Sequence, residues 1–247
     1  MNNIAPLSGP EIAHLHDACL SWYDRSARDL PWRRTEATPW HVMISEFMLQ
    51  QTPVARVLPV YEAWVSAWPL PADLAREPVG EAIRAWGRLG YPRRAMRLHA
   101  CARTIVERHD GEVPDALDDL RALPGVGEYT AAAVATFAHG RRHAVLDTNV
   151  RRVFARAVTG EQYPSRSLSV EERRLGDRLL PQQADVAARW SVAVMELGAL
   201  CCTATSPACD RCPLRSQCAW RRSGYPEYDG PARRGQTYAG TDRQCRG

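Results

Sequence analysis

Apolar residues recur at intervals of three and four along most of this 247-residue chain, and that periodicity constrains the fold more than any other feature. Leu98, Ala102 and Ile105 illustrate the spacing, which is typical of amphipathic helices around a shared core. Prolines stand at many of the expected helix starts, where their missing N–H costs nothing. No convincing run of alternating strand residues is present. We predict an all-α protein with helices over 10–27, 39–51, 53–67, 79–88, 93–108, 114–121, 128–139, 147–158, 168–180 and 183–199.

The basic residues exclude several classes of enzyme. All 32 of them are arginine, so the chain has no lysine to form a Schiff base, bind pyridoxal phosphate or serve a Walker-A loop. The net charge of +4 comes mostly from residues 221–247, which carry +3, so charge alone does not indicate a nucleic-acid partner. A partner of that kind must be inferred from motifs.

Hydropathy argues against a membrane or secreted protein. The longest run without a charged residue, Leu197–Cys209, has 13 residues and is too short to span a bilayer. The N-terminus lacks the basic start and apolar core of a secretory signal. We therefore expect a cytoplasmic protein without a membrane partner.

Residues 221–247 differ in composition from the rest of the chain. They contain no Leu, Ile, Val, Met, Phe or Trp but have five glycines and two prolines. Such a segment buries too little apolar area to offset its ordering entropy. We predict a linker or tail over residues 223–247.

Five of the eight cysteines lie within 18 residues, and four of them form the set Cys202, Cys209, Cys212 and Cys218. Thiolates gathered by a Cys-x2-Cys pair and short loops bind soft metal, either tetrahedral zinc or an iron–sulfur cluster. Spacing does not separate these two. Disulfides are the third possibility, which the absence of a secretory signal disfavours. We expect the fifth cysteine, Cys201, to be a small buried hydrophobic residue.

A glycine-rich turn, Pro124, Gly125, Val126 and Gly127, separates two helical segments. Glycine allows a tight turn and close approach of another group, and the N–H groups of the following helix face outward with the positive end of its dipole. This arrangement can bind a phosphate. A plain connector between two helices explains the same residues.

Three motifs then occur in order: LPGVGEYTAAAV, VLDTNVRRV and ELGALCC with the four-cysteine loop. Together they resemble the helix–hairpin–helix DNA glycosylase superfamily that includes endonuclease III. ISEFMLQQTPVARVLPVYEAW, LPWRR and GRLGYPRRAMRL resemble its A/G-specific adenine glycosylase branch, the MutY family, in high-GC bacteria. The resemblance covers about residues 10–222.

The resemblance implies a two-lobed, all-α fold that binds DNA between its lobes. Residues 30–141 would form a six-helix barrel with the hairpin, and 1–29 plus 142–222 would hold a [4Fe–4S] cluster on the four cysteines. The C-terminal module that recognises 8-oxoguanine in full-length relatives is expected to be absent. The family removes adenine mispaired with 8-oxoguanine or guanine in double-stranded DNA. We expect a monomeric, nucleoid-associated bacterial enzyme.

Base removal needs a proton on the leaving base and negative charge near the sugar cation. Glu46 lies in the middle of an apolar helix, where desolvation favours the protonated acid. Asp147 directly precedes a helix, whose dipole and free N–H groups favour a carboxylate. By resemblance Glu46 protonates adenine, Asp147 stabilises the oxocarbenium ion, Asn149 orients Asp147 or the adenine, and Tyr129 holds Asp147 and the sugar. Tyr129 stands where bifunctional relatives carry the attacking lysine.

The resemblance also assigns DNA contacts. Gln51 would fill the gap left by the flipped base, and Thr52 would meet the opposite purine. Leu89 and Tyr91 would wedge beside that purine. Arg151 would face a phosphate, as would the hairpin. Trp32 and Arg33 match an adenine-pocket segment, with one extra residue before Glu46.

Two other functions remain open from the sequence. A thymine or uracil mismatch glycosylase of the same superfamily shares Tyr129 and Asp147, and Glu46 within SEFMLQQT argues for adenine instead. A metal-stabilised protein that binds damage without cutting is the non-enzymatic alternative. It would lack a catalytic carboxylate, whereas both carboxylates are present.

Overall fold

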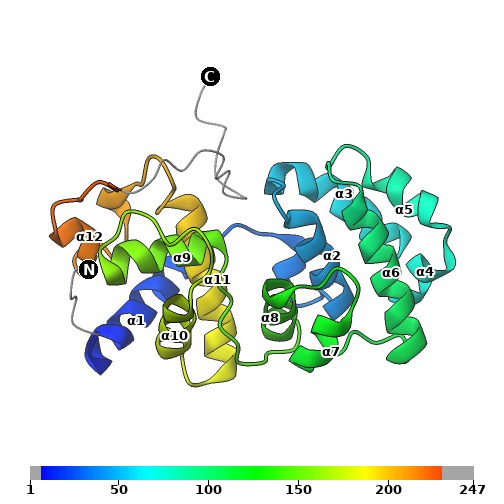
Figure 1. Cartoon of the computed structure of the whole chain (residues 1–247), viewed down its shortest axis with the longest axis horizontal. Helices are drawn as coiled ribbons and strands as arrows, with labels where there is room; N and C mark the ends of the chain where they lie inside the picture. Colours follow the sequence, from blue (N-terminus) through cyan, green and yellow to red (C-terminus); the bar gives the residue numbers. More distant parts are fainter. Residues whose placement is uncertain (1–6, 230–247) are drawn as a thin grey trace. The chain divides into compact units, whose positions relative to one another are not determined.

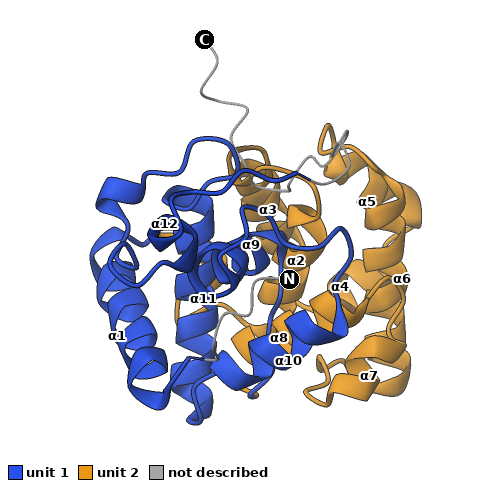
Figure 2. Ribbon diagram, turned by 60° about the vertical axis from the view of Figure 1, so that its left-hand side comes forward, with its two compact units in different colours: residues 1–28, 142–247 blue, residues 29–141 orange. Residues whose placement is uncertain are grey.

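The computed structural model describes residues 7–229 and is helical throughout, with no strand among them (Figure 1). No helix in this range is long and apolar enough to cross a membrane. The chain divides into two compact units, residues 29–141 (unit 2) and residues 1–28 with 142–247 (unit 1) (Figure 2). The N-terminal helix therefore belongs to the same unit as the C-terminal half of the chain.

Unit 2 contains α2 to α8. Their bounds are α2 Pro39–Leu49, α3 Val54–Ala67, α4 Pro71–Arg76, α5 Val79–Trp86, α6 Arg93–Arg108, α7 Leu117–Ala122 and α8 Glu128–Phe137, preceded by a 3-10 turn at Pro31–Arg33. Helix α2 is its central element, because eight of its eleven residues are buried. It packs against α3, α6 and α8. A helix that is buried on every side has no solvent face, so a polar residue on it needs a special reason.

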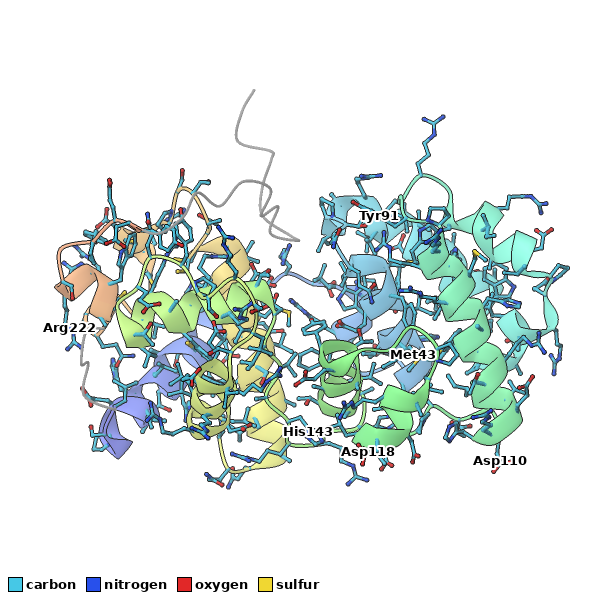
Figure 3. The ribbon with its side chains drawn as sticks, in the orientation of Figure 1. Met43, Tyr91, Asp110, Asp118, His143 and Arg222 are labelled. Atoms are coloured by element: carbon cyan, nitrogen blue, oxygen red, sulfur yellow. The ribbon has the colours of Figure 1, made fainter. Side chains whose placement is uncertain are left out.

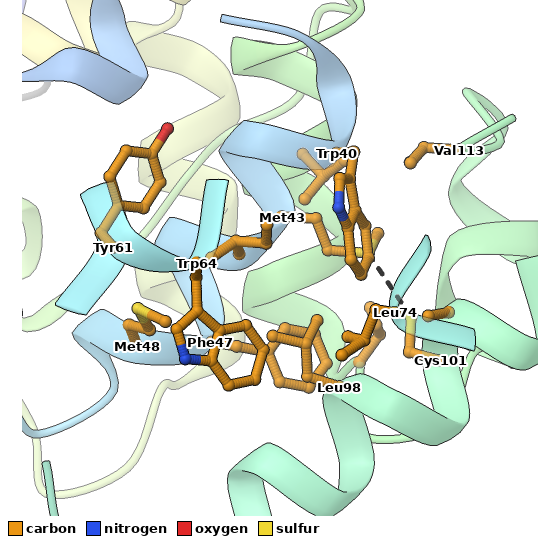
Figure 4. Packing of buried hydrophobic residues seen from close by; sticks show 14 of the residues in the cluster. Trp40, Met43, Phe47, Met48, Tyr61, Trp64, Leu74, Leu98, Cys101 and Val113 are labelled. Atoms are coloured by element: carbon orange, nitrogen blue, oxygen red, sulfur yellow. Dashed lines mark hydrogen bonds between the residues drawn. The ribbon is translucent and has the colours of Figure 1, made fainter. Parts of the chain in front are cut away.

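The core of unit 2 is rich in aromatic and sulfur-containing side chains (Figure 4). Trp64 meets Trp68 and Trp86 edge to face, with ring centroids 4.8 and 5.5 Å apart. The Cys101 thiol lies 3.4 Å from the Met43 sulfur. These contacts surround α2 and fix the helix that carries Glu46.

Unit 1 is built around α11 (Ala184–Leu200). The other elements are α1 Gly9–Ser26, α9 Thr148–Phe154, a π-helical turn Ala155–Thr159, α10 Val170–Leu179, a 3-10 turn Cys209–Arg211 and α12 Ala219–Arg222. Helices α1 and α9 both pack on α11. Trp190 of α11 stacks on Phe154 at 5.8 Å, which joins α9 to this core.

The structure corrects several helix predictions. Residues 71–76 form α4, for which no helix was predicted, so unit 2 has seven α-helices rather than six. Helix α7 starts at Leu117, not at 114. Helix α2 ends at Leu49 because Gln50 leaves the helical region with ψ 107°, and Gln51 follows with φ 56°. The helix predicted over 147–158 is α-helical only to Phe154 and continues as the π-helical turn.

Residues 223–229 of the predicted linker or tail contain no helix and are mostly exposed, but they contact unit 1. The Trp220 indole donates to the Pro226 carbonyl at 2.9 Å, and the Tyr228 N–H donates to the Gln162 side chain at 2.9 Å. Tyr225 lies edge to face with Trp220 at 4.9 Å. The tyrosines supply the apolar area that a count of aliphatic residues misses. The rest of the predicted tail, 230–247, lies outside the described residues.

An ion pair with one buried partner joins the segment after α1 to α11. Arg28 donates to both carboxylate oxygens of Glu196, at 2.7 and 2.8 Å, and its backbone N–H donates at 3.1 Å. The Glu196 side chain is fully buried. Removing one partner of a buried pair leaves the other charge uncompensated, whereas exposed pairs contribute little.

We expect Arg28→Ala to lower the free energy of unfolding by about 3 kcal/mol, because it removes this cation from the fully buried Glu196 carboxylate. The matched control is Asp24→Ala, which breaks the exposed Arg189–Asp24 pair between the same two helices. That change should cost below about 1 kcal/mol. Urea unfolding followed by circular dichroism measures both. Equal losses of unfolding free energy in the two variants would show that the Arg28–Glu196 pair contributes no more than the exposed pair.

Candidate active site and cysteine centre

Glu46 lies on the central helix α2 of unit 2 and is buried, with 7 % of its surface exposed. Its neighbours Ser45 and Phe47 are also buried. The structure therefore gives this carboxyl group the buried position that its apolar helix predicted. A carboxyl group in such a place is suited to acid–base chemistry rather than to solubility.

The turn after α2 and the loop before α6 lie together. Thr52 Oγ1 is within 3.4 Å of the Leu89 carbonyl oxygen, and both side chains are buried. Gln51 and Tyr91 are exposed, and Figure 3 shows Tyr91 at the start of α6. The DNA contacts predicted for Thr52 and Leu89 remain predictions, for residues whose side chains are buried here. Gln51 and Tyr91 remain available for contact.

The backbone conformation and the close neighbours of position 125 in the hairpin require a glycine there. Its φ is +81°, and a Cβ there would lie 2.7 Å from Arg97 Cβ and 3.0 Å from the Phe47 ring. The hairpin thus packs on α6 and on α2. Its contact residue on α2, Phe47, directly follows Glu46 in the sequence. Gly127 differs, because a Cβ there would meet nothing within 4 Å. Its open side leaves the start of α8 accessible to another molecule.

The predicted adenine-pocket residues lie at the edge of the unit 2 core. Trp32 is buried and meets Tyr61 edge to face at 5.0 Å. Arg33 is half-buried on the same 3-10 turn. Tyr129 is half-buried in the first turn of α8. Packing explains Trp32 without any ligand.

Asp147 is the N-cap of α9 in unit 1. Its Oδ1 accepts from the Val150 N–H at 2.6 Å, and its Oδ2 accepts from the Asn149 amide at 2.7 Å. Burial raises the pKa of Asp147, while these two donors and the nearby Arg152 charge lower it. The raised pKa differs from the prediction that the helix end simply favours the carboxylate, because desolvation is the largest effect.

Arg152 connects Asn149 to the rest of unit 1. It is fully buried and donates to Asn149 Oδ1 at 2.8 Å, to the Gly198 carbonyl at 2.6 Å and to the Cys202 carbonyl at 2.7 Å. The amide orientation of Asn149 is thereby fixed, with its oxygen toward Arg152 and its nitrogen toward Asp147. Sequence reasoning missed Arg152, although an arginine among the apolar residues of a helix was a signal.

Arg151 has a partner within the protein. Its guanidinium lies 2.8 Å from Glu172 and also donates to the Ser165 carbonyl at 2.8 Å, and its side chain is 10 % exposed. The predicted phosphate contact would have to compete with this ion pair. The structure favours a role in joining α9 to α10.

Cys202, Cys209, Cys212 and Cys218 line one recess, together with Cys201, Arg156 and Trp220. Within residues 7–229, no three His, Cys, Asp or Glu side chains lie close enough together to hold a single metal ion. Cys201 is 5 % exposed and packs in the core of unit 1, as predicted.

Arg156 from the π-helical turn lies beside this recess. It donates to the Thr203 carbonyl at 2.6 Å and lies 3.5 Å from the Cys202 sulfur. Its guanidinium stands over the Trp220 ring at 4.8 Å. Burial raises the pKa of the Cys202 thiol, and the Arg156 charge opposes that effect. A buried cation beside the sulfur favours the thiolate that a metal needs.

Two family models match the chain. The model of the HhH-GPD superfamily base excision DNA repair proteins matches residues 44–174, and the iron-sulfur binding domain of endonuclease III matches residues 202–218. The adenine DNA glycosylase of Mycobacterium tuberculosis is 52 % identical over 242 residues, which cover 98 % of this chain and 78 % of that protein. The chain belongs to the adenine DNA glycosylase family of the HhH-GPD superfamily.

Related glycosylases share the fold. The thymine/uracil-DNA glycosylase of Pyrobaculum aerophilum is 32 % identical over 209 residues, which cover 83 % of this chain and 90 % of that protein. The solved structure of a thermostable thymine-DNA glycosylase superposes with a TM-score of 0.78 at 26 % identity, covering 86 % of this chain and 97 % of that one. The chain is accordingly a DNA glycosylase, an enzyme of base excision repair that hydrolyses N-glycosidic bonds.

As in endonuclease III-type iron–sulfur domains, the cofactor of this adenine DNA glycosylase family member is a [4Fe–4S] cluster. The four thiols around one recess fit it. When bound, the cluster supplies four iron–thiolate bonds that hold the loop 202–218 on unit 1. Sequence spacing had left zinc open as an alternative.

We expect Cys212→Ser to lose the cluster and Cys201→Ser to retain it, because only Cys212 belongs to the four-ligand set. The purified protein should be brown and contain about four irons per chain. Visible absorption and iron analysis measure both. A colourless protein with stoichiometric zinc after anaerobic purification would contradict the assignment.

We expect Gly198→Ala to slow base release by about 100-fold, because a misplaced catalytic group loses orientation. A Cβ at Gly198 would lie 2.7 Å from Asn149 Cβ and 2.8 Å from the Asn149 carbonyl oxygen, so α9 must shift. Gly80→Ala is the control, since a Cβ there meets nothing within 4 Å. Single-turnover assays compare the two. Unchanged release by Gly198→Ala would show that Asn149 tolerates displacement.

Proposed function

We propose that this glycosylase, acting as a monomer, removes adenine from A·8-oxoguanine and A·G mispairs in double-stranded DNA without cutting the strand. The observation that carries the proposal is the buried Glu46 on α2, a carboxyl group that can protonate a purine ring. The 52 % identity to a mycobacterial adenine DNA glycosylase supports the same substrate.

The reaction divides between two carboxyl groups. Glu46 donates a proton to the adenine ring as the N-glycosidic bond breaks and its electron pair moves to the base. The ionised Asp147 stabilises the positive charge that develops on the sugar, and water then adds to the anomeric carbon. Asn149 keeps the Asp147 carboxylate oriented through its 2.7 Å hydrogen bond. Tyr129 would contact the sugar.

DNA contacts come from exposed features of unit 2. Gln51 would fill the space of the flipped base and Tyr91 would wedge beside the opposite purine. The N–H groups at the start of α8, next to the open Gly127, would hold a phosphate. Trp32 and Arg33 would line the adenine pocket. Arg151 would reach a phosphate only if its ion pair with Glu172 opened.

Four duplexes distinguish this proposal from its alternatives. Each carries one A·8-oxoguanine, A·G, A·T or T·G pair, and the free base is identified by mass spectrometry under single-turnover conditions. We expect adenine from the first two and no base from the others. Thymine from T·G without adenine would indicate the thymine/uracil activity. Mispair binding without any base release would indicate a non-catalytic protein.

We expect Glu46→Gln and Asp147→Asn each to slow adenine release by about 1,000-fold, since each removes a group that acts in the transition state. Both variants should still bind the mispaired duplex. The control is Glu107→Gln, which alters an exposed carboxylate on α6. Quenched-flow and gel-shift measurements separate rate from binding. Near-normal release by either active-site variant would contradict its role.

We expect an abasic product that breaks only after alkali or heat. Strand cleavage through an imine needs a nucleophilic amine, and the chain has no lysine. Borohydride should therefore trap almost no protein–DNA complex. The α-amino group is the one remaining amine, and its acetylation provides the control. Efficient trapping that survives acetylation would overturn the monofunctional mechanism.

A further inference from the structure

Arg94, in the first turn of α6, is buried and bonded to oxygen atoms of two separate turns. Its Nη1 donates to the carbonyl oxygens of Phe47 at 3.1 Å, Met48 at 3.0 Å and Gln50. Its Nη2 donates to Thr52 Oγ1 at 2.9 Å, the Gly90 carbonyl at 3.1 Å and the Leu89 carbonyl at 3.4 Å. One guanidinium thus joins the end of α2 to the loop before α6.

The partners of this cation are carbonyl and hydroxyl oxygens. Three of the carbonyls lie at the C-terminal end of α2, where helix carbonyls have no intrahelical donor and carry the negative end of the helix dipole. The rings of Trp86 and Tyr91 lie 5.2 and 5.5 Å from the guanidinium carbon. Helix dipole and aromatic faces therefore stabilise a charge that burial and Arg56 would otherwise disfavour.

The two turns that Arg94 joins share an unusual backbone. Gln51 has φ 56° and Tyr91 has φ 50°, and neither is glycine. The left-handed region costs a residue with a Cβ roughly 1–2 kcal/mol, so it persists only where neighbouring contacts hold it. Arg94 supplies those contacts on both sides of Gln51 and immediately before Tyr91. Both strained residues are exposed, whereas the residues that hold them are buried.

We propose that Arg94 is a positioning residue that holds Gln51 and Tyr91 as one rigid pair, so that both side chains enter the DNA stack together at a mispair. This inference rests on the proposed function, which places these two side chains against the DNA. Because both turns are already rigid in the free protein, DNA binding does not have to order each of them separately. The entropy cost of inserting the two side chains is therefore smaller, which favours binding to the distorted duplex over ordinary DNA. The residue therefore contributes to mispair recognition without touching the reacting atoms.

Arginine is required at this position by geometry. Its planar fork presents five donors in fixed directions, and two of its nitrogens divide between the two turns. Lysine has the same charge but gathers its three donors on one nitrogen, so it cannot join both turns. Arg94→Lys should consequently behave like Arg94→Met. If only the positive charge mattered, Arg94→Lys would instead behave like the wild-type protein.

The test compares Arg94→Lys and Arg94→Met with Arg103→Met, an exposed arginine on the same helix. We expect the Arg94 variants to lose at least about tenfold in affinity for the A·8-oxoguanine duplex, a difference of about 1.4 kcal/mol, while affinity for a fully paired duplex stays within about twofold. Cluster absorbance and circular dichroism show whether each variant is folded. Equal losses on both duplexes, or full rescue by lysine, would overturn the proposal.

A double-mutant cycle tests the rigid pair directly. In the wild-type background Gln51→Ala and Tyr91→Ala should be strongly non-additive in mispair affinity, because loss of one disables the other. In the Arg94→Lys background the same two changes should each have little effect. Additive effects in both backgrounds would show that Gln51 and Tyr91 do not act as one rigid pair.

Hydrogen exchange keeps this inference separate from the proposed function. Backbone exchange in residues 50–53 and 87–91 should rise together in both Arg94 variants and stay unchanged in Arg103→Met, whatever base the enzyme removes. If the wild-type protein does not prefer the mispair, the proposed function fails while this measurement still decides whether Arg94 joins the turns. Unchanged exchange in either segment would show that Arg94 does not hold both turns.

Discussion

The chemistry assigned to unit 1 depends on two hydrogen bonds to one carboxylate. The Val150 N–H and the Asn149 amide each donate to a different oxygen of Asp147, at 2.6 and 2.7 Å. Burial disfavours the charged form of this group, so the two donors and the Arg152 cation are what keep an ionised carboxylate accessible. An Asp at an ordinary N-cap stabilises a helix; a buried one also holds a charge ready for a cationic sugar.

The orientation of that carboxylate depends in turn on contacts far along the chain. Asn149 is held by Arg152, whose other donors reach the carbonyls of Gly198 on α11 and Cys202 at the start of the cluster loop. Gly198 lets α11 approach α9 closely. The cluster loop, the central helix of unit 1 and the catalytic helix start therefore form one hydrogen-bonded and packed assembly. The loop proposed to hold the cluster is thereby joined to the residues that orient Asp147.

Local patterns predicted much of this. Apolar periodicity and helix-start prolines predicted the long helices, and the position of Asp147 before an apolar helix predicted its N-cap. The buried position of Glu46 followed from its apolar neighbours. Gly125 needed no structure to be recognised as a turn residue, although only the structure shows that Arg97 and Phe47 exclude a side chain there.

The errors arose where a residue's partner lies far away in sequence. Arg94 and Arg156 are indistinguishable from solvated arginines until the backbone carbonyls that surround them are placed, and Arg152 differs from them only by its apolar neighbours in the helix. The resemblance assigns DNA contacts to Thr52 and Leu89, and the sequence does not show that both side chains are buried or that Thr52 accepts a hydrogen bond from Arg94. Arg151 likewise finds Glu172, 21 residues away.

The central claim is that Asp147 acts as a carboxylate held in its charged form by Asn149, and the pH dependence of adenine release tests it most directly. Release should fall as pH decreases through the pKa of Asp147, which lies above the usual range for an aspartate. Asn149→Ala removes a donor to the charged form, so the pKa rises further and the acid limb should move to higher pH by about one to two units. An acid limb that stays in place in Asn149→Ala would contradict the account.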